Sequence, residues 1–215
     1  IRRGAADFPD RARWLQDIRK SGDLGGLYAD MLKDALRNIE ETFAAISTDD
    51  LKAAAEAIWA ARRVFTLGVG VNNSVARNFT YLASTGMTEF HAIPRPGSTP
   101  ADDLAWADGR DVLIAMTSRP YRTEVVKAVE IAREQGMTII ALSDSPASPI
   151  LRGADHGFVV SVDTPQFFPS SIGTIALLET LLSFVVAVAS EEIVERVETF
   201  HKRRHQLGMY YAEDK

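Results

Sequence analysis

The sequence of 215 residues contains no cysteine. Disulfides, thiolate metal sites and cysteine nucleophiles are therefore excluded. It also lacks an uninterrupted apolar run of the ~20 residues that a membrane-spanning helix needs. The most apolar stretch, 172–189, is broken by Glu179, Thr180 and Ser183. We therefore expect this stretch to form a buried core or interface helix, and we expect no membrane partner.

The amino terminus lacks an initiator methionine and the apolar segment of a signal peptide. We therefore expect a fragment or a processed product that resides in the cytoplasm. Asp and Glu (29) outnumber Lys and Arg (24), so the net charge is −5. This balance disfavours broad binding to a polyphosphate surface, which requires clustered Lys and Arg. The composition is otherwise typical of a globular protein, and a chain of this length can bury a sizeable core.

Apolar residues recur at helical spacing in the first third of the chain and predict helices beginning near Pro9, Leu27 and Leu51. The glycine-rich run 21–26 predicts a linker. From residue 62 onward, short β-rich runs alternate with helical segments. The predicted strands are 64–68, 89–93, 112–117, 138–143 and 157–162, and the predicted helices are 75–84, 101–107, 121–135, 171–189 and 191–205. This alternation predicts an α/β fold, a three-layer α-β-α sandwich around a parallel sheet.

Ligands of such folds bind where the strands end, and the first strand ends in GVGVNNS at 68–74. Glycines allow close approach to a ligand, and a helix start attracts an anion. The candidate ligand-binding residues here are Gly70, Asn72, Asn73 and Ser74. The alternative is that the glycines only form the turn while an asparagine caps the helix. A nicotinamide-dinucleotide site is disfavoured because the third fingerprint glycine is Asn73, and no Gly-Lys-Ser/Thr of a Walker motif follows.

The third strand ends in TSRPYRTE at 117–124. Two guanidinium groups there can grip an anion, and two hydroxyls can bond to its oxygens. The candidate residues are Thr117, Ser118, Arg119 and Arg122. In the alternative interpretation, Thr123 and Glu124 cap the next helix, and the arginines face solvent or pair with Asp102 and Asp103.

Hydroxyl side chains also follow the fourth and fifth strands. Ser143 and Ser145 lie in a turn by composition, and Ser170 precedes the apolar helix. All three are candidates for the rim of the ligand site, although Ser170 suits a helix cap equally well. Phe167 and Phe168 could form a wall over the site, but buried packing is the commoner fate of phenylalanine.

Catalytic groups are few. His201 and His205 have a spacing that can hold a metal, but Lys202, Arg203 and Arg204 between them would repel a cation. Only Glu124 and His91 can be nominated as a general base. We therefore predict no enzymatic activity, no catalytic residue, no metal site and no cofactor.

The order of these features resembles the SIS (sugar isomerase) domain at the carboxyl end of RpiR/MurR-type bacterial transcriptional regulators. The segments that carry the resemblance are 67–76, 111–126 and 140–145, and the likeness extends over about 27–205. Residues 7–15 resemble the last helix of that family's helix-turn-helix domain. The resemblance implies a remnant of the DNA-binding domain at 1–22 and an SIS effector-binding and oligomerisation domain at 23–215.

The family implies a five-stranded, flavodoxin-like sheet that binds a phosphorylated sugar in a dimer or tetramer, and operator DNA bound through the largely absent amino-terminal domain. The family's first-loop serine falls at Asn72. Its Ser-x-Ser-Gly-x-Thr motif falls on 117–122, where Arg119, Pro120 and Arg122 replace the second Ser, the Gly and the Thr. We predict that both arginines grip a sugar phosphate or a small organic anion without turnover. The alternatives are an aldose–ketose isomerase of sugar phosphates and an oligomerisation module with a vestigial pocket.

Overall fold

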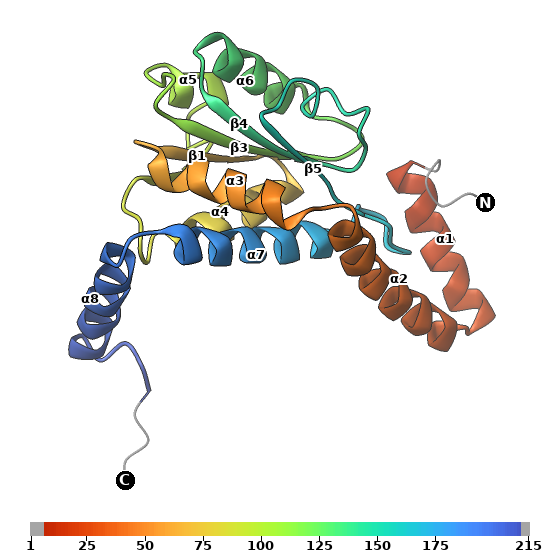
Figure 1. Cartoon of the computed structure of the whole chain (residues 1–215). Coiled ribbons are helices and arrows are strands. Elements are labelled where there is room, and N and C mark those ends of the chain that lie inside the picture. Colours follow the sequence, from red (N-terminus) through yellow and green to blue (C-terminus); the bar gives the residue numbers. More distant parts are fainter. Residues whose placement is uncertain (1–6, 212–215) are drawn as a thin grey trace.

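The computed structural model describes residues 7–211, which contain a five-stranded parallel sheet between layers of helices (Figure 1). The order across the sheet is β2-β1-β3-β4-β5. The strands are β1 (Val64–Gly68), β2 (Phe90–Ile93), β3 (Val112–Thr117), β4 (Thr138–Ser143) and β5 (His156–Val159). The predicted α-β-α sandwich is confirmed. The last strand ends three residues before the predicted end, although Val160 N still donates to the carbonyl oxygen of Ser143 on β4 at 2.9 Å.

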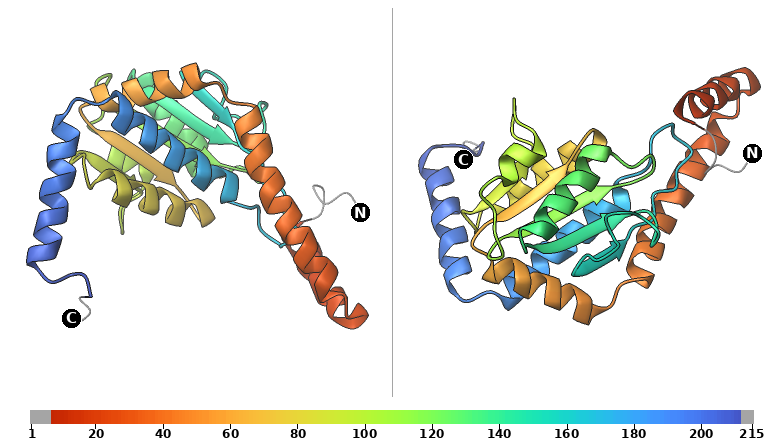
Figure 2. Two further views of the ribbon diagram at one scale, coloured as in Figure 1. Left: turned by 60° about the horizontal axis from the view of Figure 1, so that its bottom comes forward. Right: turned by 90° about the horizontal axis from the view of Figure 1, so that it is seen from above.

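Helices cover both faces of the sheet (Figure 2). One face carries α5 (Pro100–Leu104) and α6 (Thr123–Glu134); the other carries α3 (Thr48–Ala60), α4 (Val71–Ala83) and α7 (Ile172–Val188). Strand β3 alternates between two apolar cores. Ile114 and Met116 pack on the α3, α4 and α7 side, whereas Leu113 and Ala115 pack on the α5 and α6 side. This alternation is the two-residue period of a strand buried on both faces.

Two helices precede the sandwich: α1 (Phe8–Ser21) and α2 (Leu24–Ala44). The predicted linker at 21–26 is wrong for residues 24–26, which form the first turn of α2. Gly22 alone makes the reversal, at φ 73°, and the Asp23 side chain caps α2 by accepting from Gly26 N at 2.9 Å. The two helices are therefore joined by a tight corner instead of a flexible tether.

Helix α8 (Glu192–Gln206) follows α7 after a sharp bend and projects from the sandwich (Figures 1 and 2). Within residues 7–211, no single helix has the length and apolar character to cross a membrane. Only α7 and α8 taken together meet those criteria, and they are bent by 116° where they join.

The two edges of the sheet carry different chemistry. At the edge where the strands begin, Asp111 is fully buried and accepts from Arg62 Nε at 2.9 Å and from Arg63 Nη2 at 2.7 Å. Burial favours the protonated acid, but the hydrogen bonds from both arginines outweigh it and hold the pKa of Asp111 well below its usual value. Both carboxylate oxygens of Asp111 are thus engaged by arginine side chains at this edge.

Candidate functional site

The carboxyl ends of β3 and β4 and the start of α4, which follows β1, meet the start of α7 around a small cavity. Four of the predicted ligand-binding residues line it: Asn72, Thr117, Ser118 and Ser170. Two neighbouring loops therefore converge there with the residues before α7, as predicted. The cavity measures about 10 Å³, which is room for roughly one water molecule.

The glycine turn and the arginine loop lie side by side. Gly70 has φ 64° and is the N-cap of α4, so this helix begins at Val71 and not at 75 as predicted. A β-carbon built on Gly70 would lie 3.9 Å from Arg122 Nη1. Gly68 has no room for a side chain, because its β-carbon would lie 2.1 Å from the carbonyl oxygen of Asn72. The turn is thus tight, and one guanidinium group stands directly beside it.

Helices that start at this edge lack the side-chain caps found elsewhere. The N-cap side chains of α1, α2, α3 and α5 cap those helices, whereas the N-cap residues of α4, α6 and α7 make no side-chain cap. At α7 the Ser170 hydroxyl instead accepts from Ile172 N at 3.3 Å. Free N–H groups at a helix start, together with the helix dipole, favour an anion. Helix α8 also lacks a cap but starts elsewhere. The starts of α4 and α6, after the first and the third strand, therefore present backbone donors at a shared edge.

Both predicted arginines are exposed and hold carboxylates. Arg119 Nε donates to Asp144 Oδ2 at 3.0 Å, across to the loop after β4. Arg122 donates twice to Glu124, at 2.9 and 3.0 Å. The alternative partners, Asp102 and Asp103, are engaged elsewhere, since Asp102 completes the cap of α5 and Asp103 binds Arg95.

These pairs keep the groups charged. The hydrogen bonds with Asp144 and with Glu124 raise the pKa of Arg119 and of Arg122, respectively. In return, Arg122 lowers the pKa of the Glu124 carboxyl. Burial raises the pKa of the Tyr121 phenol between them. A second anion can replace Glu124 at little cost, because exposed ion pairs contribute little to stability, whereas the Asp144 side chain is only 8% exposed.

Four predicted residues lie away from the cavity or satisfy local bonds. Ser143 is fully buried and donates to the carbonyl oxygen of Thr117 at 2.7 Å. The Asn73 side chain turns back to the carbonyl oxygen of Gly68, Ser74 bonds to that of Val71, and Ser145 accepts from Ala147 N. These contacts shape the loops, so any ligand contact by these four residues stays a prediction.

Groups for acid–base or metal chemistry are poorly placed. Glu124 is held by Arg122, and His91 lies 3.6 Å from Glu89 on β2. The Nε2 atoms of His201 and His205 lie 2.9 Å apart on α8, outside the cavity. Among residues 7–211 no group of three or more His, Cys, Asp or Glu side chains could hold a metal ion.

Sequence reasoning missed three contributors to this edge. Asp144 joins the third and fourth loops through Arg119, and Thr174 and Pro169 line the cavity. No local pattern marks them, because each acts across loops that only the folded sheet brings together. Glu179, within the apolar helix, proves to be exposed.

Comparison with known proteins identifies the family to which this fold belongs. The family model of the SIS domain matches residues 57–190. An HTH-type transcriptional regulator of Clostridium perfringens is 26% identical over 176 residues, covering 77% of this chain and 61% of that protein. An arabinose 5-phosphate isomerase of Pseudomonas aeruginosa is 26% identical over 145 residues, covering 65% and 44%. This chain therefore spans about three fifths of the regulator.

Comparison with solved structures also finds proteins of this fold. The sugar isomerase domain of the RpiR transcription factor from Sphaerobacter thermophilus superposes with a TM-score of 0.75 at 27% identity, covering 82% of this chain and 98% of that one. The Vibrio vulnificus NanR protein complexed with ManNAc-6P gives a TM-score of 0.70 at 20% identity, covering 90% and 73%. The predicted resemblance to RpiR-type regulators is confirmed, and the chain belongs to the SIS-domain family.

Proposed function

We propose that this chain is the effector-sensing part of a bacterial DNA-binding transcriptional regulator. It binds a phosphorylated sugar or a related small organic anion without converting it. The single observation that carries this proposal is the convergence of Arg119 and Arg122 with the uncapped starts of α4 and α6 at one sheet edge. Fixed cations beside free backbone donors suit a phosphate group.

Regulators among the relatives support the absence of turnover. The described residues near the cavity offer Glu124 as a carboxylate, and its two bonds to Arg122 hold it as an ion-pair partner. A general base needs a pKa near the working pH, whereas the pKa of Glu124 is lowered. The NanR complex with ManNAc-6P supports a sugar phosphate as the effector class.

A screen of thermal stability tests the ligand class. ManNAc-6P, arabinose 5-phosphate, inorganic phosphate and small dicarboxylic acids are added to the purified chain. We expect a phosphorylated sugar to raise the melting temperature, because a ligand that binds only the native state stabilises it. No shift with any probe at millimolar concentration would contradict the proposal.

The second candidate function is an isomerase of sugar phosphates, which the arabinose 5-phosphate isomerase relative favours. Proton NMR of each sugar phosphate incubated with the chain separates the two. We expect the spectrum to stay unchanged. Conversion that Glu124→Gln abolishes would make the chain an enzyme.

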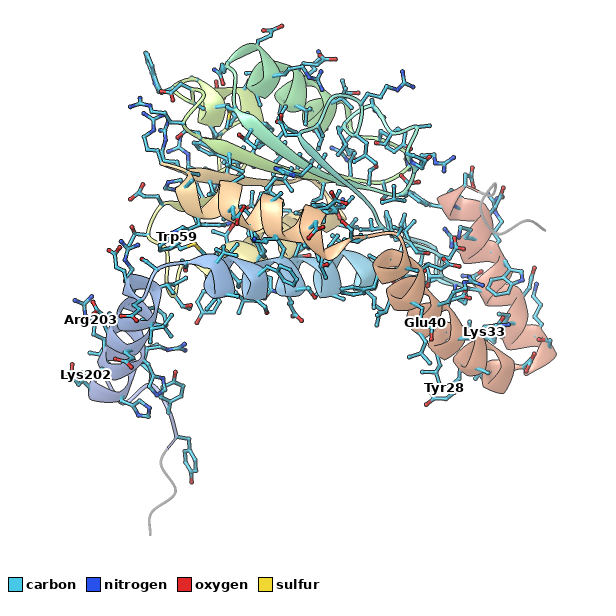
Figure 3. All side chains as sticks on the ribbon, in the orientation of Figure 1. Tyr28, Lys33, Glu40, Trp59, Lys202 and Arg203 are labelled. Carbon is cyan, nitrogen blue, oxygen red and sulfur yellow. The ribbon has the colours of Figure 1, made fainter. Side chains whose placement is uncertain are left out.

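We further propose a cytoplasmic homo-oligomer, a dimer or tetramer, with residues 23–215 as the effector-binding unit. Residues 1–22, of which 7–22 are described, form the remnant of a helix-turn-helix domain that reads operator DNA. Helix α2 bears an exposed apolar stripe: Leu24, Tyr28, Leu32 and Leu36. Tyr28 is 72% exposed and extends from the helix (Figure 3). Such a patch is typical of an interface.

Light scattering after size exclusion tests the oligomer. We expect Leu32→Glu to lower the measured mass toward that of a monomer, because it buries a charge in the apolar stripe. Lys33→Glu, one residue on, is the matched control and should leave the mass unchanged. Equal masses for the wild-type chain and both variants would contradict a role for α2.

A further inference from the structure

One wall of the cavity comes from the segment that follows β5. We define residues 160–171 as the wall segment. Val160, Val162, Pro169 and Ser170 of this segment line the cavity. Strand residues such as Met116 and Leu142, which are buried in the sheet, form another part of the lining.

The first part of the wall segment is fastened to α2. Asn38 is fully buried, and its Nδ2 donates to the carbonyl oxygen of Asp163 at 2.6 Å. Its Oδ1 accepts from Ser161 Oγ at 2.9 Å and from Asp163 N at 3.1 Å. Thr42, also buried, accepts from Ser161 N at 3.0 Å. These bonds fix 161–163, because freeing a buried amide from its partners is costly.

The next part of the wall segment lies against α1, which stands beside α2 in Figure 1. The ring of Phe168 contacts the ring of Phe8, with centroids 4.5 Å apart. Arg11 donates through Nη2 to the carbonyl oxygen of Thr164. Residues 164–168 are therefore held by the helix that precedes the effector-binding domain, while the residues directly after them line the cavity.

The cavity is too small to hold the proposed effector. Pockets for small metabolites measure roughly 300–1,000 Å³, whereas this cavity measures about 10 Å³. A sugar phosphate therefore enters only if part of the lining moves. The sheet residues are fixed in the core and 161–163 are fixed by Asn38 and Thr42. Ser170 is also fixed, because it is buried and its N–H donates to the carbonyl oxygen of Val162 at 3.0 Å. Residues 164–169 are therefore the part of the wall segment that is left to move, and they contact α1 through Thr164 and Phe168.

We propose that effector occupancy and the docking of α1 on the wall segment oppose each other. This inference rests on the proposed function. The closed cavity and the Phe8–Phe168 contact form one state, and the open, occupied cavity forms the other. Asn38 and Thr42 are positioning residues that, together with the bond from Ser170 to Val162, confine the movement to 164–169 and direct it to α1. The apparent dissociation constant then equals the intrinsic one divided by the open fraction.

Two manipulations of the α1 contact are expected to act with opposite signs on affinity. Phe168→Ala removes the contact with Phe8 and raises the open fraction, so ManNAc-6P or arabinose 5-phosphate should bind at least threefold more tightly. Phe168 does not line the cavity, and simple damage to the protein would weaken binding instead. Phe167→Ala is the matched control, expected within twofold of the wild-type chain, because its ring contacts Phe168 rather than Phe8.

The second manipulation locks the contact. The chain has no cysteine, so Phe8→Cys/Phe168→Cys can be joined selectively by a short bis-methanethiosulfonate linker. Calorimetric titration with the same two probes should show affinity at least tenfold weaker after linking. Reduction of the linker, verified by mass spectrometry, should restore it.

The outcomes separate the two proposals. Tighter binding by Phe168→Ala together with weaker binding of the linked protein supports the coupling. Binding by the wild-type chain that both manipulations leave unchanged, or shift in one direction, overturns the coupling and leaves the proposed function intact. If neither probe binds the wild-type chain or any variant, the proposed function fails for these sugar phosphates and the coupling fails with it.

Discussion

The two edges of the parallel sheet use arginine in opposite ways. Where the strands begin, Arg62 and Arg63 converge on Asp111, which is fully buried and accepts from both of them. Where the strands end, Arg119 and Arg122 are exposed, and they lie beside the starts of α4 and α6, which no N-cap side chain caps. Arg122 pairs with the exposed Glu124, and Arg119 pairs with Asp144, whose side chain is largely buried. The buried cluster at Asp111 stabilises the fold, whereas the exposed Arg119 and Arg122 can reach an anion from solvent.

Burial explains the difference. A buried carboxylate requires partners, since breaking a buried pair leaves an uncompensated charge. The exposed Arg122–Glu124 pair contributes little, so another anion can displace Glu124. We therefore expect variants of the first edge to lose stability and variants of the second edge to lose ligand affinity.

The largest effect is expected at Asp111. Asp111→Asn removes the charge that both arginines bind and should lower the free energy of unfolding by about 3 kcal/mol. Urea unfolding followed by circular dichroism measures this loss. Effector affinity should remain within twofold at temperatures where the variant is folded. An Asp111→Asn variant with unchanged stability and altered effector affinity would contradict the proposal that this edge serves stability and the other serves ligand binding.

Variants of the two arginines at the other edge should lose ligand affinity and keep their stability. Arg122→Gln removes a charged donor beside Gly70, and we expect effector affinity to fall at least tenfold with an unchanged urea midpoint. Arg119→Gln should act in the same direction through the neighbouring loop. Arg110→Gln, at the first edge, is a matched control with no expected effect on affinity. Unchanged affinity in both Arg119→Gln and Arg122→Gln would remove the arginines from the site.

A smaller effect is expected at the glycine turn. Gly70→Ala forces a β-carbon into φ 64°, which costs about 1 kcal/mol of stability. It also places a methyl group beside the Arg122 guanidinium, so affinity should fall a few-fold as well. Gly136→Ala, at φ 73° before β4 at the edge where the strands begin, should also cost stability but without loss of affinity. Equal affinity losses in both variants would point to a general effect of loop strain.

The smallest effect is the dependence of stability on pH. Because Asp111 has a lowered pKa in the folded chain, its stabilisation is complete above the unfolded value of about 4 and is lost as pH falls through the folded value. We expect constant stability from pH 7 to 5 and a decline below about pH 4. The decline should be shallower in Asp111→Asn. An identical decline in this variant would assign the acid sensitivity to other carboxylates.

The strands and both candidate loops were predictable, because short apolar, β-rich runs and glycine turns are local signals. The start of α4 was not, since Val71 and the two residues after it look like loop by composition and Gly70 alone sets the boundary. The pairing of Arg119 with Asp144 depends on strand order, which places β4 beside β3. Likewise, the contact of Phe168 with Phe8 joins residues 160 positions apart, and no local pattern encodes it.

The most direct test of the central claim is an amide NMR titration of the chain with the sugar phosphate that stabilises it most. The account predicts chemical-shift changes that cluster at 70–73 and 118–123, where the strands end, with none at Arg62, Arg63 or Asp111. Changes that cluster at the Asp111 edge or along α8, with the two loops unaffected, would contradict it.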